Sequence, residues 1–191
     1  MLSNALIFLI QTAFGLFVVA LLLRFYMQWV RAPYRNPLSE FLQALTDFIV
    51  RPARRVVPGL WGLDLATLVL AWLIQLAEIV IVMQLRGLDS GPDAGAAFAW
   101  LVLLALVVLA KTGLYMLLVI IVLQVLLSWL APGSPVMPLL NSLTRPVLRG
   151  FQRRIPPIGN VDLSPLIALV VIQLLLMLPV AWAEMTLTRL L

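Results

Sequence analysis

The sequence predicts an all-α membrane protein with about four transmembrane helices, arranged as two parallel two-helix repeats that each carry a short cytoplasmic amphipathic helix. Three observations lead to this prediction. Of the 191 residues, 63% are hydrophobic and only 11% are charged, whereas soluble domains average about 45–50% apolar and about 25% charged residues. Four long apolar runs follow one another along the chain. A basic, proline-containing stretch between the first two runs recurs between the last two.

Each of the four apolar runs is close to the ~20 residues that a helix needs to cross the hydrocarbon core of a bilayer. The runs extend over Ala5–Leu23, Leu65–Leu85, Leu109–Leu130 and Leu163–Trp182. The first positive side chain, Arg24, follows the first run, whereas a signal peptide carries its positive charge before the apolar stretch. We therefore expect the first run to be a retained span.

The third run leaves two alternatives, because apolar sequence already begins near Ala94. One helix from there to Leu130 would be ~55 Å long at 1.5 Å per residue, which exceeds a simple span. Alternatively, residues 94–110 form a separate short segment that turns at Lys111–Gly113. We expect four crossings, with Ala94–Val108 as an outer-leaflet extension or a partial insertion. This divides the chain into a first repeat (1–86), an outer loop with its apolar extension (87–108) and a second repeat (109–191).

The distribution of positive charge favours four crossings over five. Ten of the 13 Lys and Arg residues flank or occupy the first and last connecting segments: Arg24, Arg31, Arg35, Arg51, Arg54, Arg55, Arg145, Arg149, Arg153 and Arg154. Lys and Arg are enriched on the cytoplasmic side of membrane proteins. Four crossings place both segments there and both termini on the outer side, whereas five would put the two segments on opposite faces.

The two halves of the chain are related by an internal repeat. A shift of 98 residues places Arg51 on Arg149, Asp64 on Asp162, and the triplet Ile-Gln-Leu at 74–76 on the same triplet at 172–174. Upstream, a shift of 100 pairs Trp29 with Trp129. Self-similarity at a fixed separation indicates duplicated structural units, here a span, a cytoplasmic segment and a returning span with the same orientation.

Each cytoplasmic segment contains the pattern of an amphipathic helix. In NPLSEFLQALTDFIV, apolar residues recur at the 3.6-residue period of a helix with polar residues between them. Asn36 is a suitable N-cap and Pro37 suits the first turn. A similar pattern follows Pro135. These helices are too short and too polar to span, so we expect them to lie along the inner interface or between the spans.

The stretches LLLRFYMQWV, NPLSEFLQALT and RPARRVVPGLWGLDLATL, with LLSWLAPGSPV and LTRPVLRGFQRRIPPIGNVDLSPL in the second half, resemble the YggT family of bacterial and chloroplast membrane proteins. The likeness covers nearly the whole chain, in the two-copy arrangement of the proteobacterial members. One departure is that RP at 51–52 becomes RG at 149–150, which indicates that the halves are not interchangeable.

The resemblance implies a multi-pass protein of the bacterial inner membrane, with periplasmic termini under the topology above. Family members are linked to osmotic or salt stress and ion homeostasis, to cell-division gene neighbourhoods, and in plastids to cytochrome assembly and nucleoid organisation. The resemblance implies no defined biochemical activity.

Composition argues against catalysis and cofactor binding. The chain contains no Cys and no His, which removes thiol chemistry and the commonest metal ligand and general base. A P-loop, a dinucleotide fingerprint and metal-ligand spacing are also missing from the sequence. We expect no enzyme activity, no cofactor and no metal site. Nucleic acid is not an expected partner despite the net charge of +5, because the basic residues are sparse.

Two sets of charged residues in the connecting segments are candidate functional residues. Arg54, Arg55, Arg153 and Arg154 either set topology and contact anionic lipid headgroups or form a docking patch for a cytoplasmic partner. Asp64 and Asp162 each precede a returning span. They either cap that helix or form a cation site where the halves meet.

Polar residues within the spans form the third set. Gln75 and Glu78 lie one turn apart on one helix, and Lys111 is the partner expected for Glu78. Buried ionisable groups in a bilayer are costly unless paired, so this pair either fixes helix packing or lines a proton or cation path. Gln75 and its repeat counterpart Gln173 are expected to hydrogen-bond across the central helix interface.

Together these features favour a non-catalytic scaffold or modulator in osmotic or salt stress and ion homeostasis, or in membrane and cell-division organisation. The alternative is an oligomeric channel or transporter for a small cation or osmolyte. The expected partners are the lipid bilayer, anionic headgroups at the cytoplasmic face, a cytoplasmic or membrane protein, and further copies of the chain.

Overall fold

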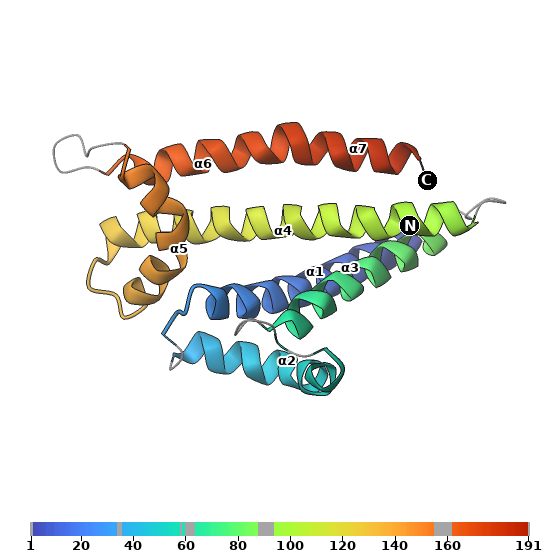
Figure 1. Ribbon diagram of the computed structural model, residues 1–191, viewed down its shortest axis with the longest axis horizontal. Helices are drawn as coiled ribbons and strands as arrows, with labels where there is room; N and C mark the ends of the chain where they lie inside the picture. Colours follow the sequence, from blue (N-terminus) through green and yellow to red (C-terminus); the bar gives the residue numbers. More distant parts are fainter. Residues whose placement is uncertain are drawn as a thin grey trace.

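The computed structural model describes residues 2–33, 36–57, 59, 64–87, 94–154 and 162–190, and this part of the chain is helical, without strands (Figure 1). The first half contains α1 (Leu2–Trp29), α2 (Pro37–Val56) and α3 (Leu65–Leu85). The second half contains α4 (Ala94–Leu130), α5 (Met137–Gln152), α6 (Ser164–Leu175), the π-helical turn η1 (Leu176–Val180) and α7 (Ala181–Arg189). The all-α prediction is confirmed.

Four helical stretches are long and apolar enough to cross a membrane: Ser3–Trp29, Leu65–Leu85, Ala97–Leu130 and Ser164–Arg189. Between 17% and 28% of the most apolar window of each stretch is buried inside the protein. The remaining side chains of these windows face outward, where only hydrocarbon would solvate them favourably. The chain is therefore a multi-pass membrane protein, as the sequence predicts.

The third span is one continuous helix of 37 residues, so the expected extension is confirmed and the alternative turn at Lys111–Gly113 is wrong. The polar groups at this point are satisfied within helical geometry. The Thr112 hydroxyl donates to the Val108 carbonyl at 2.9 Å, and Lys111 pairs with Glu184. A single glycine inside a helix costs only about 1 kcal/mol, and neighbouring helices readily compensate for it.

The spans pack around α4, which lies between the α1–α3 pair and the α6–α7 stretch (Figure 1). One core cluster joins α1, α2, α3, α4 and α5 around Val18, Leu21, Leu143 and Ala71. A second cluster joins α4, α5 and α6 around Ile121, Ala168 and Ile172, and extends to η1. Both termini lie toward one end of the bundle, and α5 crosses the opposite end (Figure 1), which is the arrangement that four alternating crossings require.

Both expected amphipathic helices are present. Asn36 caps α2, because its side chain accepts from the Ser39 backbone N–H at 2.8 Å, and Pro37 occupies the first turn. The helix packs against both α1 and α3. Pro52 and Pro146 lie inside α2 and α5, so neither helix ends at its proline. Pro58 and Pro156 lie outside the described residues.

The faces of α2 divide into three kinds, which positions the polar side chains discussed below. Ser39, Leu42, Thr46 and Val50 are buried against the protein. Phe41, Leu45 and Phe48 form an exposed apolar stripe, and Phe48 meets Phe17 of α1 with ring centroids 5.8 Å apart. The stripe is the part of α2 that would contact lipid, whereas the polar residues at its other edge would face water.

Candidate functional site

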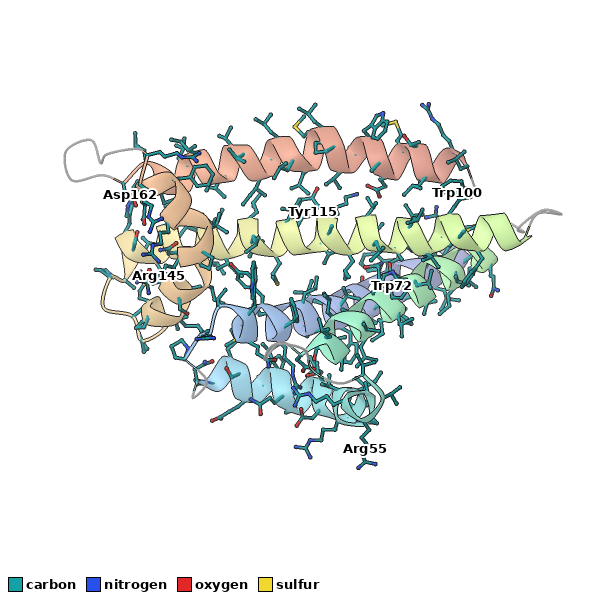
Figure 2. All side chains as sticks on the ribbon, viewed as in Figure 1. Arg55, Trp72, Trp100, Tyr115, Arg145 and Asp162 are labelled. Atoms are coloured by element: carbon teal, nitrogen blue, oxygen red, sulfur yellow. The ribbon has the colours of Figure 1, made fainter. Side chains whose placement is uncertain are left out.

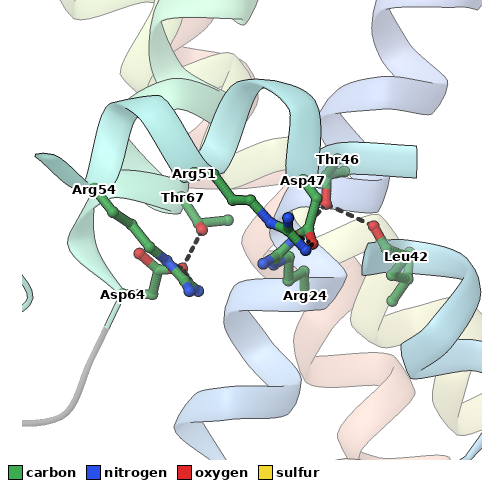
Figure 3. A network of polar contacts seen from close by, with 8 residues as sticks. All are labelled: Arg24, Leu42, Thr46, Asp47, Arg51, Arg54, Asp64 and Thr67. Carbon is green, nitrogen blue, oxygen red and sulfur yellow. Dashed lines mark hydrogen bonds and ion pairs between the residues drawn. The ribbon is translucent and has the colours of Figure 1, made fainter. Parts of the chain in front are cut away.

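The densest group of polar side chains lies where α1, α2 and α3 meet (Figure 3). Arg24, near the end of α1, donates from Nη1 to the Thr46 hydroxyl at 2.6 Å and to Asp47 Oδ1 at 2.7 Å. Arg51 pairs with the other carboxylate oxygen of Asp47 at 2.7 Å. One carboxylate therefore holds two guanidinium groups, one from α1 and one from its own helix.

The Arg24 side chain is only 10% exposed, although it belongs to an apolar span. A charge in this setting is costly unless it is paired and hydrogen-bonded, and here Thr46 and Asp47 on α2 supply both interactions. Burial raises the pKa of Asp47, but the hydrogen bonds from Arg24 and Arg51 and their positive charges outweigh burial and lower it. The carboxylate is therefore ionised at neutral pH, and the pair fixes α2 against α1.

A second ion pair joins the end of α2 to the start of α3. Arg54 donates to Asp64 Oδ2 from both Nε and Nη2, and the Thr67 hydroxyl donates to the same oxygen. The Asp64 side chain is only 4% exposed. Burial raises its pKa, but the hydrogen bonds from Arg54 and Thr67 and the Arg54 charge outweigh burial and lower it.

Asp64 thus occupies the N-cap position of α3 while its carboxylate binds the side chains of Arg54 and Thr67. Asp64 therefore lies at the predicted N-cap position, but it forms no capping hydrogen bond by the usual geometry, and its main partners are the two side chains. A cavity of about 20 Å³ remains between Arg24, Arg54 and Ser39. It has room for about one water molecule and is too small for a metabolite.

The corresponding positions of the second half carry weaker, uncharged contacts. Gln124, the counterpart of Arg24, donates to Asn141 Oδ1 at 2.9 Å. Gln152, the counterpart of Arg54, donates to Asp162 at 2.9 Å. Asp162 also accepts from the Ser164 backbone N–H at 2.9 Å, so it binds the first turn of α6 in the manner expected of a capping residue.

The polar residues inside the spans are paired differently from the prediction. Gln75 is buried and donates to Glu78 Oε2 at 2.8 Å. Lys111 of α4 pairs with Glu184 of α7 at 2.6 Å, so the predicted Glu78–Lys111 pair is wrong. The predicted bond between Gln75 and Gln173 is also wrong, since the Gln75 amide binds Glu78 and the Gln173 side chain is exposed. The cation site expected from Asp64 with Asp162 is untested.

Sequence reasoning missed several members of these networks: Arg24 with its α2 partners Thr46 and Asp47, Thr67 beside Asp64, and Glu184 as the partner of Lys111. A signal existed for Asp47, because Asp at i and Arg at i+4 commonly pair on one helix face. Glu184 follows the last apolar run, in which the chain stays helical through η1 despite Pro179. A charge beyond a predicted span is usually assigned to the surface, and this assignment concealed it.

The remaining candidates, Arg55, Arg153 and Arg154, are exposed. Their side chains form no ion pair or hydrogen bond with other described residues. Arg55 lies on α2 and the other two follow α5, so the structure presents them outward and does not bring them together. Among the described residues, no three potential metal ligands lie close enough to form a metal site.

Comparison with known proteins gives one family. The model of the CCB3/YggT family matches the chain twice, over residues 3–85 and 98–183. The chain is 36% identical to an uncharacterized protein of Pseudomonas aeruginosa over 93% of its own length and 89% of that protein. It is 31% identical to the uncharacterized protein YggT of Escherichia coli K12 over 90% of its length and 87% of that protein. No solved structure matches the chain.

The Arg24–Asp47 contact should contribute measurably to stability. We predict that Arg24→Gln lowers the free energy of unfolding by about 1–3 kcal/mol, because it removes a charged donor from a largely buried carboxylate. Thermal unfolding of the purified protein in detergent measures the change. Arg51→Gln is the matched control: it removes the other guanidinium from Asp47, but from a side chain that is 77% exposed. Its effect should stay below about 1 kcal/mol, and equal effects would contradict the account.

The Arg54–Asp64 pair predicts an acid-sensitive junction between α2 and α3. The pKa of Asp64 in the folded protein lies below its ordinary value of 3.8. Its stabilising contribution is therefore complete above about pH 3.8 and is lost as the pH falls through the lower folded-state value. Hydrogen exchange of the α2–α3 junction should show lost protection over this acid range. In Asp64→Asn the same junction should be less protected at neutral pH and insensitive to acid; an unchanged acid response would locate the titrating group elsewhere.

Proposed function

The chain belongs to the CCB3/YggT family, and from this premise we propose that it is a non-catalytic membrane scaffold or modulator. It would act in osmotic or salt stress and ion homeostasis, or in the organisation of the membrane at cell division, as the resemblance to the family implies. The helices that contact its partners would be α2 and α5, and their arginines would hold them at the cytoplasmic face of the inner membrane.

The observation that carries this proposal is the use of polar side chains inside the bundle. Arg24 with Asp47, Arg54 with Asp64 and Lys111 with Glu184 each join two different helices. Such pairs fix helix packing, and each charge is already neutralised by its partner on the other helix. The cavity beside Arg24 and Arg54 is about 20 Å³, which leaves little room for a substrate next to the paired carboxylates.

The exposed arginines of α2 and α5, in contrast to the paired charges inside the bundle, face away from the protein. We define the arginine surface as two separate groups of exposed residues, Arg51 and Arg55 on α2, and Arg145, Arg149, Arg153 and Arg154 on and after α5. Guanidinium groups bind carboxylates and phosphates through paired hydrogen bonds. An acidic protein segment or anionic lipid headgroups would therefore be the partners of this surface.

The apolar stripe of α2 supports a location at the membrane surface. Phe41 and Phe48 are 60% and 71% exposed, which is unfavourable in water and favourable in the hydrocarbon boundary of a bilayer. Asp47 and Arg24 fix the rotation of α2 about its axis, so the same interaction sets the direction of both the stripe and the arginines.

A channel or transporter is the second candidate function, and the polar groups within the spans favour it. Glu78 lies half-buried in α3 with Gln75 as its partner, and Lys111 and Glu184 are each about one-third exposed. Each group is satisfied by one neighbour, so a continuous polar path would need several copies of the chain around a pore.

The scaffold proposal predicts that salt tolerance depends on the arginine surface. In a host strain that lacks its own relative of this protein, Arg55→Glu with Arg153→Glu should reduce growth at high salt to the level of an empty vector. Both side chains are exposed, so protein level and thermal stability should not change. Arg86→Glu is the control, because this exposed arginine follows α3 at the other end of that span. Full complementation by the double variant would contradict the proposal.

Reconstituted vesicles separate the two candidate functions. With a potassium or sodium gradient across the vesicle membrane, the scaffold proposal predicts no flux above that of protein-free vesicles. Flux that is abolished by Glu78→Gln would establish the channel in its place.

A further inference from the structure

A groove opens at the end of the second half, between the last turns of α4 and the first turns of α6. Its volume is about 540 Å³, within the range of about 300–1,000 Å³ that is typical of small-molecule sites. Gln124, Val125, Ser128 and Trp129 line it from α4, and Asp162, Leu163, Pro165, Leu166 and Leu169 line it from α6 and the residues before it.

The groove faces the lipid phase. Trp129 and Leu166 are 78% and 60% exposed at its edges, and large apolar side chains at an opening favour hydrocarbon over water. On the α6 side its lining is polar at Asp162, which precedes α6, and apolar toward Leu169, farther along that helix. This gradient from polar to apolar matches a phospholipid, whose headgroup lies at the interface and whose acyl chains lie deeper.

The lining offers hydrogen-bond acceptors from Asp162, Gln124 and Ser128. Asp162 offers a carboxylate, and it forms no salt bridge with any described residue. The Gln124 Oε1 atom is buried without a hydrogen-bond partner in the described part of the chain. Ser128 donates its hydroxyl proton to the Val125 carbonyl at 2.7 Å, which leaves its oxygen lone pairs free to accept. The lining contains no Lys or Arg, so a donor-rich cation complements it.

The two repeat-related aspartates, Asp64 and Asp162, have different partners. Asp64 receives two hydrogen bonds from the guanidinium of Arg54. In the second half the counterpart of that arginine is Gln152, and its neutral side-chain amide donates one hydrogen bond to Asp162. The tight α1–α3 packing of the first half is also looser between α4 and α6. The carboxylate at this repeat position is therefore paired with an arginine of the same chain in the first half, and it lies beside an open groove in the second half.

We propose that this groove binds one phospholipid with a primary ammonium headgroup, phosphatidylethanolamine, whose ammonium donates to the exposed carboxylate of Asp162. A primary ammonium has three N–H donors, whereas the quaternary ammonium of phosphatidylcholine has none. The bound ammonium takes the place that the Arg54 guanidinium fills in the first half. Arg145 lies at the same end of the molecule as Asp162 (Figure 2), although it does not line the groove.

The charge state of Asp162 agrees with this role. Burial raises its pKa, but hydrogen bonds from Ser164 and Gln152 outweigh burial and lower it. The carboxylate is therefore ionised at neutral pH and can receive a charge-assisted hydrogen bond.

Native mass spectrometry of the full-length protein, titrated with dioleoyl phosphatidylethanolamine, phosphatidylcholine or phosphatidylglycerol, tests the proposal. We expect one molecule of phosphatidylethanolamine to bind about tenfold more tightly than either other lipid, the factor that corresponds to one charge-assisted hydrogen bond. Asp162→Asn should abolish this preference. Glu40→Gln neutralises an exposed acid on α2 and is the matched control, which should keep it.

A second variant keeps the test independent of folding defects. Gln152→Arg introduces the guanidinium of the first half and should pair with Asp162, so the protein should be at least as stable while losing the lipid preference. Equal binding of phosphatidylethanolamine and phosphatidylcholine, or a preference for phosphatidylglycerol, would overturn the proposal. A lipid preference that survives both Asp162→Asn and Gln152→Arg, or a lipid-free dimer, would also overturn it.

Discussion

The ion pair between Arg24 and Asp47 is the interaction on which the arrangement of the first half depends. A guanidinium that is 10% exposed near the end of an apolar span must find a partner, because an unpaired buried charge is strongly destabilising. The partner lies on α2, so α2 must pack against α1. This packing buries Thr46 and Leu42, turns Phe41 and Phe48 outward, and brings the end of α2 to the start of α3.

Much of this architecture could be predicted from the sequence, since it depends on patterns that act locally. Apolar runs of about 20 residues give the spans, and the helix from Leu65 to Leu85 has the predicted ends. Asn36 and the 3.6-residue pattern give α2. The extension of α4 follows from continuity of apolar residues, although the sequence alone left a break at Lys111 open. The orientation relative to the cell stays a prediction.

The pairing of polar side chains could not be predicted, because it depends on which helices become neighbours. Glu78 and Lys111 are the oppositely charged residues expected to pair between the second and third spans, yet Lys111 meets Glu184 across the α4–α7 contact. Asp64 has the sequence context of an N-cap, yet Arg54 reaches it from the previous helix. In both cases the partner is decided by which helices become neighbours, and sequence spacing does not contain this information.

The two halves show how one duplicated unit can carry different chemistry. Arginine at positions 24 and 54 makes the first half closed and internally paired, whereas glutamine at 124 and 152 leaves the second half with neutral contacts and an open groove. The family model matches both halves, although their polar contacts differ.

The coupling energy between Arg24 and Asp47 tests the central claim most directly. A double-mutant cycle with Arg24→Gln, Asp47→Asn and the combined variant, followed by unfolding in detergent, isolates the energy of this pair from the other effects of each substitution. The account predicts a favourable coupling of about 1 kcal/mol or more. A coupling near zero would show that α2 is held in place by its apolar contacts alone, and would contradict the role assigned to the ion pair.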